Sequence, residues 1–387
     1  MKNEILNDKY TEYIYQAFDI QNKKETLVRI PINFKEINTF DWNIGVIYGG
    51  SGTGKTTLLK EFGQLIEDKF DHNKPLISNF DWLEPKEATF LLSAMGLASV
   101  PTWLRPFHLL SNGEQYRARL AYKVGKANNN DVILIDEFTS VVDRDVAKAM
   151  SNALQKYIRR NNKKIILASC HFDIMEWLLP DWTYSPLKGR LERASCPRQR
   201  PKIELQIFRS RYKAWDLFKQ NHYLTEDLNQ ACICYITLWN DKPVCFNAVL
   251  PFPHGNIENG YRMSRTVVLP DYQGMGIGGK ITDYLASLYK SVGRTMYVKT
   301  SNPALWSHRD RSPNWKLTTE VTEDKLNSEW MAEMQKADKG GMLSYRNAVT
   351  KSYKWVGYSS EDNTNIVLMK NDTYKHVAQN QISIFDL

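Results

Sequence analysis

Three short apolar runs stand out in the first half of the chain, at residues 45–48, 132–135 and 165–168. Continuous apolar runs of this length are typical of strands that are buried within a sheet. Apolar residues also recur at helical spacing at positions 58, 59, 62 and 65, and residues 116–122 have a helical pattern. Strands that alternate with helices predict an α/β domain.

The second half has a different pattern, in which strands follow one another with few helices between them. We expect strands at residues 203–208, 231–239, 243–250, 263–269 and 295–300, and helices at 212–222 and 281–288. The turn Asn240-Asp241-Lys242 joins two of these strands as a hairpin. A meander of this kind predicts an α+β domain, so the fold class is α/β and α+β.

Composition fits a globular protein with more than one domain. The 387 residues are 42% hydrophobic and 24% charged, enough for two or three domains with cores of their own. The roughly 18 consecutive apolar residues of a membrane span are missing, and residues 1–8 lack the apolar core of a signal peptide. The five cysteines have no zinc spacing, and Cys232 and Cys234 alternate within an expected strand, so we expect buried, reduced thiols and a cytoplasmic protein.

The net charge of the chain indicates which partner it binds and does not affect the predicted fold. The formal net charge is +8, the isoelectric point is near 9.0, and the chain has 11 Trp and 20 Tyr. A basic chain rich in aromatic residues favours a nucleic-acid partner. The lack of a long apolar run favours no membrane partner. This indication is compositional, because many unrelated proteins are equally basic.

A glycine-rich loop follows the first apolar run. Its spacing, Gly49-x-x-x-x-Gly54-Lys55-Thr56, is the full phosphate-loop pattern. The glycines let backbone N–H groups turn inward around phosphates, Lys55 can reach the β- and γ-phosphates, and Thr56 can hold Mg²⁺. The ATP ligands expected here are Gly49, Gly50, Ser51, Gly52, Thr53, Gly54, Lys55, Thr56 and Thr57.

Polar residues follow the other two apolar runs. The second run is followed by Asp136, which is placed to bind Mg²⁺, and by Glu137, which is placed to accept a proton from the attacking water. Asp143 lies in a turn expected at the edge of the nucleotide. The third run is followed, three residues later, by His171. The sequence therefore predicts an ATP-hydrolysing site.

The stretch Leu-Ser-Asn-Gly-Glu-Gln before the helical pattern completes a family resemblance. Residues 1–190 resemble an ABC-type ATPase domain, with its Walker A, LSGGQ-like signature, Walker B with catalytic glutamate, D-loop and switch histidine in the family's order. Asn112 and Glu114 depart from the signature pattern. The backbone N–H groups of Ser111 and Gly113 are still expected to grip a γ-phosphate.

The resemblance implies an assembly. In this family ATP is held between the Walker A of one copy and the signature of another, so we expect a head-to-tail homodimer when ATP is bound. The interval between Lys55 and Ser111 leaves room only for a small helical insert at residues 85–110. A short insert without a membrane segment favours the branch that acts on DNA, RNA or ribosomes over transporters.

A stretch rich in Pro and Arg separates the two patterns. Residues 191–202 predict a basic linker between an ATPase domain at 1–190 and an acyltransferase-like domain with an extension at 203–370, followed by a tail at 371–387. The arginines of the linker either contact phosphates or form an ordinary solvated segment.

A second glycine loop opens the helix expected after the strand at 263–269. Gly274-x-Gly276-x-x-Gly279 would pass as a dinucleotide fingerprint, which also needs an acidic residue about 20 positions further on, at a strand end. That strand instead ends near Lys299, and the upstream strands form a meander. The pattern Gln273-x-x-Gly276-x-Gly278 is the better match.

This second pattern resembles the acetyl-CoA motif of the GNAT N-acyltransferases, whose order of elements residues 203–317 follow. The resemblance implies that backbone N–H groups of the loop hold the CoA pyrophosphate. The expected CoA ligands are Val267, Val268, Leu269, Gln273, Gly274, Met275, Gly276, Ile277, Gly278 and Asn302.

Two histidines are candidates for proton transfer. His308 falls near the position of the family's general-acid tyrosine and could protonate the leaving CoA thiolate. His254, in a Pro-Phe-Pro-His-Gly loop, is a rival. Either residue is equally well explained as an ordinary surface histidine, and no glutamate is clearly placed as a general base.

The C-terminal part adds two further resemblances. Residues 352–357 are similar to phage Mom-type DNA-modifying GNAT proteins. The tail resembles the peptide by which DNA-processing proteins dock on the bacterial sliding clamp, since apolar side chains there enter a groove while a polar head sets the register; the alternative is a tail strand packed on the protein itself. The residues that match this peptide are Gln381, Ile382, Ser383, Ile384 and Phe385.

These patterns combine into one functional hypothesis with two alternatives. We expect an enzyme of a bacterial, archaeal or phage-infected cell in which ATP closes a dimer on nucleic acid, with DNA favoured over RNA. The second domain then transfers an acyl group, expected to be acetyl, from acetyl-CoA to a base amine. The alternatives are acylation of tRNA or protein, with the ATPase as a remodeller, and a non-catalytic module that binds CoA or DNA.

Overall fold

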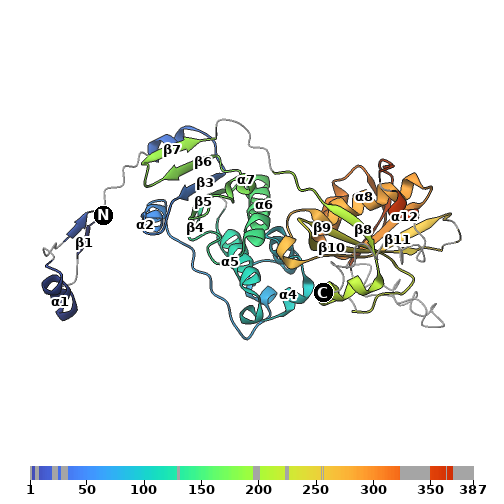
Figure 1. The fold of residues 1–387 in the computed structure, drawn as a ribbon, viewed down its shortest axis with the longest axis horizontal. Helices are drawn as coiled ribbons and strands as arrows, with labels where there is room; N and C mark the ends of the chain where they lie inside the picture. Colours follow the sequence, from blue (N-terminus) through green and yellow to red (C-terminus); the bar gives the residue numbers. More distant parts are fainter. Residues whose placement is uncertain are drawn as a thin grey trace.

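The computed structural model in Figure 1 contains two large sheets, each with its own helices, and a small two-stranded N-terminal sheet that stands apart from both. It describes residues 2–4, 8–19, 25–27, 34–128, 131–194, 201–222, 226–253, 255, 257–322, 349–362 and 364–368. The small sheet pairs β1 (Lys2–Glu4) antiparallel with β2 (Glu25–Leu27), and α1 (Lys9–Ala17) between them buries no residue.

The first sheet has five strands in the order β4-β5-β3-β6-β7. The first four are parallel, which confirms the buried strands expected from the apolar runs. β7 pairs antiparallel with β6, so the first residues of the expected linker belong to this sheet. The strands are β3 (Ile44–Tyr48), β4 (Val132–Ile135), β5 (Lys164–Ser169), β6 (Trp182–Ser185) and β7 (Arg190–Arg193).

Helices pack on this sheet, and a small helical insert at residues 85–110 adds further helices to the domain. The helix after the glycine loop ends at Lys60, so the expectation that it continues to position 65 is wrong. Phe62 and Leu65 nevertheless pack against the sheet, which accounts for their apolar spacing. The elements are η1 (Phe34–Thr39), α2 (Lys55–Lys60), η2 (Leu76–Asn79), α3 (Pro85–Ala94), α4 (Val100–Leu104), η3 (Phe107–Leu109), α5 (Asn112–Lys126), α6 (Arg144–Arg160) and α7 (Met175–Leu178).

The second sheet has seven strands in the order β13-β14-β12-β11-β10-β9-β8. Every pair is antiparallel except β11 with β12, and that parallel pairing joins only residues 260–263 to 295–298. The two strands are therefore unpaired with each other toward their C-terminal ends. The strands are β8 (Gln206–Ser210), β9 (Ile233–Trp239), β10 (Lys242–Pro251), β11 (Gly260–Val268), β12 (Thr295–Thr300), β13 (Trp315–Val321) and β14 (Thr350–Trp355).

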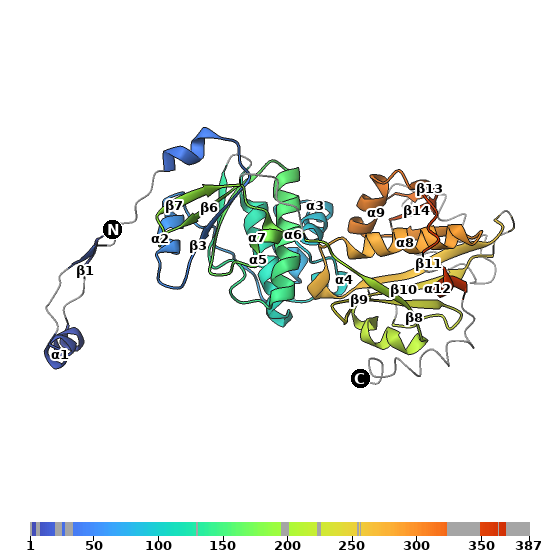
Figure 2. The same cartoon turned by 45° about the horizontal axis from the view of Figure 1, so that its top comes forward.

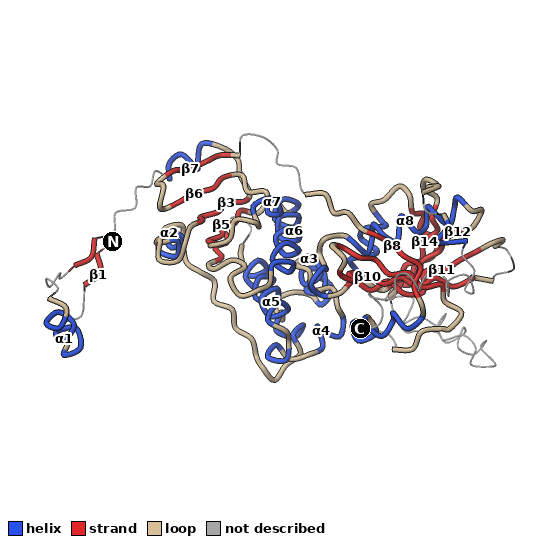
Figure 3. Tube along the Cα trace, in the orientation of Figure 1, coloured by secondary structure: helices blue, strands red, loops and turns tan. Residues whose placement is uncertain are grey.

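Helix α8 packs on the second sheet, and its residues Ile281, Leu285, Leu288 and Tyr289 lie buried in the second core. The expected helix at 212–222 is instead two 3-10 turns, held by the Trp215 indole N–H, which donates to the Glu226 carbonyl. Figure 3 shows this mixture of strands and short turns. The remaining elements are η4 (Tyr212–Leu217), η5 (Lys219–Asn221), η6 (Pro270–Tyr272), α8 (Ile277–Ser291), α9 (Pro303–Asp310) and α12 (Asn365–Leu368).

The two domains share a packed junction. Figure 2 shows α3, α4 and α6 of the first domain on the side that faces the second. Ala149 and Trp177 belong to the same apolar cluster as the core of the second domain, and the rings of Trp177 and Trp239 meet edge to face at 6.0 Å. Lys242 also pairs with Asp145 at 2.8 Å. Helices of the first domain therefore also cover part of the core of the second domain.

Candidate functional site

The C-terminal ends of three neighbouring parallel strands define the first site. In the order β4-β5-β3, these ends are followed by Asp136 and Glu137, by His171, and by the glycine loop. Neighbouring parallel strands bring the residues after them to one edge of the sheet, which is where such sheets bind ligands. The topology therefore brings together the residues that the sequence proposes for ATP hydrolysis.

The glycine loop has the shape of a phosphate cradle. Lys55 Nζ donates to the Gly50 carbonyl at 2.6 Å, and Thr53 Oγ1 donates to the same oxygen at 2.9 Å, which curls residues 49–56 on themselves. A side chain at Gly50 or Gly52 would meet nothing within 4 Å, so there is open space beside the backbone. These residues fit the β- and γ-phosphates of ATP, with Thr56 and Asp136 available to Mg²⁺.

The signature stretch forms the start of α5 and explains the unusual Glu114. Its carboxylate accepts the Ser111 N–H at 2.9 Å and the Thr102 hydroxyl at 2.8 Å, while the Ser111 hydroxyl accepts the Glu114 N–H at 3.3 Å. This is a capping box. The expectation that the Ser111 N–H is open to a phosphate is therefore wrong for this structure, and the Ser111 hydroxyl and Gly113 amide are the groups left for that role.

Tyr116 is a residue of this site that the sequence did not reveal. Its hydroxyl accepts the Thr139 N–H at 3.3 Å and donates to the Glu137 carbonyl at 3.4 Å, so α5 is tied to the turn after β4. Burial raises the pKa of Tyr116, which keeps the hydroxyl protonated. Asp143 in turn caps α6 by accepting the N–H groups of Asp145 and Val146.

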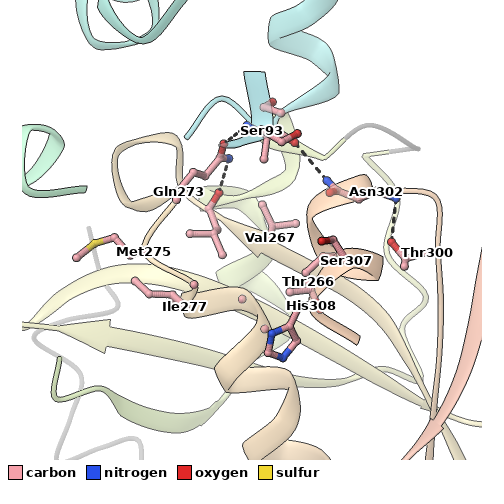
Figure 4. A pocket seen from close by; sticks show the side chains of 18 of the residues that line it. Ser93, Thr266, Val267, Gln273, Met275, Ile277, Thr300, Asn302, Ser307 and His308 are labelled. Atoms are coloured by element: carbon pink, nitrogen blue, oxygen red, sulfur yellow. Dashed lines mark hydrogen bonds between the residues drawn. The ribbon is translucent and has the colours of Figure 1, made fainter. Parts of the chain in front are cut away.

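A cavity of about 630 Å³ forms the second site, at the diverging ends of β11 and β12 (Figure 4). Its volume lies within the roughly 300–1,000 Å³ of small-molecule sites. Leu269 does not line it, because its N–H donates to the Val244 carbonyl and its side chain packs in the core. The expected CoA ligands that do line it are Val267, Val268, Gln273, Gly274, Met275, Gly276, Ile277, Gly278 and Asn302.

The loop before α8 has the backbone of an anion site. Gly274 and Gly276 have φ angles of 85° and 90°, a left-handed conformation that side chains rarely adopt. Gly276 caps α8 without any side-chain hydrogen bond, so the first-turn N–H groups face the cavity side without a capping side chain. This arrangement fits the pyrophosphate of CoA.

Gln273 and Asn302 do more than the sequence suggested, because both bind the first domain. The Ala98 N–H donates to Gln273 Oε1 at 2.8 Å, and Asn302 Nδ2 donates to the Ala98 carbonyl at 3.3 Å, as Figure 4 indicates. Gln273 Nε2 also donates to the Val268 carbonyl at 3.0 Å. The loop between α3 and α4 is thereby fixed along one rim of the cavity.

His308 lies on α9 in a defined hydrogen-bonded arrangement. Its Nε2 is 2.9 Å from Asp283 Oδ2, and Asp283 Oδ1 accepts the Trp315 indole N–H at 2.7 Å. Asp283 is buried, so it holds one side of the imidazole in place. No sequence pattern distinguishes Asp283, except that an acidic residue lies on the apolar side of a helix.

The cavity wall is cationic. It contains no Asp or Glu among the residues that the structure describes. Arg309 is buried, its Nε and Nη1 have no hydrogen-bond partner in the described part of the chain, and burial lowers its pKa to about 10. Buried donors of this kind favour an anionic ligand. The cations are Lys156, Arg160, Arg265, Lys280, Lys299, Arg309 and Arg311.

Some predictions lie elsewhere or outside the described residues. His254, Cys196 and the clamp-like residues 381–385 fall outside them. Residues 352–355 are part of β14, which pairs with strands on both sides. Cys232, Cys234 and Cys245 are free and buried as expected, whereas Cys170 is exposed. Among the helices of the described residues, none has the length and apolar character of a membrane crossing.

The fold and the two sites define an α/β domain with a phosphate-loop pattern, followed by an α+β domain with a second glycine loop. The model of the acetyltransferase (GNAT) family matches residues 174–309, which run from just before α7 into α9 and include the glycine loop of the second cavity. The sequence-based fold class, α/β and α+β, is confirmed by the two large sheets. A search among curated proteins found no similar sequence.

Solved structures resemble one or the other part of the chain. The ribosomal-protein-S18-alanine N-acetyltransferase from Escherichia coli is 13% identical, with 41% of this chain and 98% of that chain covered and a TM-score of 0.29. A Bacillus subtilis acetyltransferase in complex with CoA is 10% identical, with 40% and 98% covered and a TM-score of 0.28. A dimeric bacterial ABC transporter cassette is 15% identical, with 39% and 85% covered and a TM-score of 0.32.

Proposed function

We propose that this chain is an ATP-dependent acetyltransferase of the cytoplasm that modifies an exocyclic amine of a DNA base. The observation that carries the proposal is the second cavity, whose described wall has seven cationic side chains and no carboxylate. Such a wall attracts the phosphates of CoA and of a nucleic-acid strand. The net charge of +8 supports the same partner.

The lack of a carboxylate in the described cavity wall also indicates which kind of amine accepts the acetyl group. A lysine amine has a pKa of about 10.4 and must lose a proton before it can attack, which calls for a general base. An exocyclic base amine is uncharged at neutral pH, so it need not lose a proton before the attack, and its nitrogen gives up a proton only as the N–C bond forms. A wall of cations without a described carboxylate therefore favours a nucleobase over a protein amine.

The proposed transfer uses the His308 arrangement. The amine nitrogen attacks the thioester carbonyl, the N–C bond forms, the C–S bond breaks, and the amine proton passes to water. The CoA sulfur takes a proton from His308. Because Asp283 holds Nε2, the nitrogen left for this exchange is Nδ1. The backbone N–H groups at the start of α8 fix the donor.

The ATPase domain is proposed to hold the substrate. Two copies would bind ATP head to tail, with Lys55 and Thr56 of one copy and Ser111 and Gly113 of the other around each nucleotide. Glu137 would accept a proton from the attacking water, and His171 would contact the γ-phosphate edge. Closure of this dimer would clamp DNA beside the second domain.

Transfer of label from acetyl-CoA tests the proposal. We expect purified full-length chain with radiolabelled acetyl-CoA, ATP and double-stranded DNA to label the DNA, and His308→Phe to abolish the label. Parallel reactions with tRNA and with a cell lysate separate the alternatives. Label only on tRNA or protein would overturn the DNA assignment, and absence of label in every reaction despite CoA binding would favour a non-catalytic module.

The tail is proposed to recruit the enzyme to newly replicated DNA. Residues 381–385 resemble a sliding-clamp peptide, and the Mom-type likeness at residues 352–357 points to the same substrate. We expect purified bacterial clamp to bind a peptide of residues 371–387, and the double variant Ile384→Ala, Phe385→Ala not to bind, since the apolar anchors are lost. Equal binding of both peptides would contradict this role.

A further inference from the structure

One side of α6 faces the second domain along its whole length. Ala149 packs in the apolar cluster of that domain, Asn152 Nδ2 donates to the Gly274 carbonyl at 3.4 Å, and Ala153 lies against Gly274. Lys156 follows at the next position of the same helical spacing. Arg160, one turn later, also lines the cavity. The ATPase domain therefore contributes this helix to the acyltransferase cavity.

The fit between the domains is close at the glycine loop. A Cβ built on Gly274 would lie 2.7 Å from the Ala153 Cβ, and one built on Gly96 would lie 3.1 Å from the Gln273 carbonyl oxygen. Arg117, fully buried on α5, donates to the carbonyls of Gly96 and Pro270. Contacts of this kind hold the loop and α6 in one fixed arrangement.

Lys156 is the cation that this arrangement brings to the loop. Its Nζ donates to the Met275 carbonyl at 3.4 Å and lies 4.0 Å from the position of a Cβ on Gly276. Gly276 is the residue that caps α8, so the ammonium group stands beside the first-turn N–H groups. Gln273, the polar side chain of the motif itself, is already bonded to Ala98 and Val268.

We propose that the acyl-donor site is shared by the two domains, with the pyrophosphate of CoA held between the first-turn N–H groups of α8 and Lys156 of the ATPase domain. Arg160 extends the same cationic wall. The inference rests on the proposed function, in that the cavity binds acetyl-CoA. It adds that the acyltransferase domain is incomplete without the ATPase domain, and that one residue of the ATPase domain sets the affinity for the donor.

Calorimetric titration of the full-length chain with CoA, dephospho-CoA and pantetheine tests the proposal. We expect Lys156→Met to weaken binding of CoA and of dephospho-CoA by about tenfold or more, since a charge-assisted hydrogen bond is lost. Pantetheine, which has no pyrophosphate, should bind both proteins alike. Lys148→Met is the matched control, because Lys148 lies on the same helix outside the cavity and should leave all three affinities unchanged.

Each result has a separate meaning. Lys156→Arg keeps the charge and should bind CoA within a few-fold of the unmodified chain, which guards against a folding defect in Lys156→Met. Equal CoA affinity for Lys156→Met and the unmodified chain would overturn the shared site while leaving the acyltransferase proposal intact. If the unmodified chain binds no CoA at all, both proposals fail.

Discussion

At the scale of single residues, the arrangement of His308, Asp283 and Trp315 is the sharpest chemical feature of the second site. One carboxylate oxygen holds the imidazole and the other holds the indole N–H, so Asp283 is a positioning residue rather than a catalytic one. Removal of the imidazole should therefore be more costly to the acetyl-transfer rate than a change in the carboxylate that orients it.

We expect His308→Phe to lower kcat of acetyl transfer about 10²- to 10⁴-fold, because the leaving thiolate loses its proton donor. Asp283→Asn should lower kcat by about tenfold and leave KM for acetyl-CoA unchanged, since the amide keeps the shape but not the charge. Steady-state kinetics of both variants measure this. A rise in KM with kcat preserved would show that the pair binds the donor instead of moving a proton.

At the scale of elements, the glycine loop and α6 are matched to each other. We expect Gly274→Ala to destabilise the protein by about 1–3 kcal/mol, because its methyl group would overlap Ala153 and its φ is 85°. Gly293→Ala is the matched control, with a φ of 73° but nothing within 4 Å, and should cost only the backbone strain of about 1 kcal/mol.

Thermal and urea unfolding of these variants check the element-scale prediction. The double variant Ala153→Gly, Gly274→Ala should lose less stability than the sum of the two single variants, because the overlap is removed while the backbone strain and the cost of about 1 kcal/mol for glycine in a helix remain. If Gly274→Ala and Gly293→Ala unfold alike, the close approach of the loop to α6 does not exist in solution.

The sequence predicts elements well where their pattern is local. The strands of the first sheet are continuous apolar runs because both of their faces are buried, and the glycine loops are recognised from spacing within a few residues. The helix after Lys55 is shorter than its spacing suggests, since Phe62 and Leu65 reach the core without helical backbone. The turns at 212–222 depend on bonds to Glu226 and Leu228 that no helical period shows.

The site residues that were missed are those defined by tertiary contacts. Lys156 meets Met275, and Ala98 meets Gln273, across more than a hundred positions of sequence. Tyr116 likewise contacts the turn after β4 only once α5 is packed. A pattern read along the chain carries no information on such pairs, so the contribution of the first domain to the second cavity became visible only in the folded structure.

At the scale of the whole molecule, the head-to-tail ATP dimer is the feature to test. We expect Glu137→Gln to bind ATP without hydrolysing it and to shift from a monomer of 44.9 kDa to twice that mass, because the clamp closes and the water is not activated. Light scattering after gel filtration measures the mass. Lys55→Ala is the control, which should stay monomeric with ATP; a monomeric Glu137→Gln with bound ATP would contradict the dimer.

The most direct measurement of the central claim is a structure of Glu137→Gln determined with both ATP and CoA. The predicted result is one nucleotide at residues 49–56 and one CoA in the second cavity of the same chain, with the CoA pyrophosphate between the start of α8 and Lys156. CoA bound away from the cavity, or a loop at residues 273–278 closed against the pantetheine arm, would contradict the claim that the two domains share an acyl-donor site.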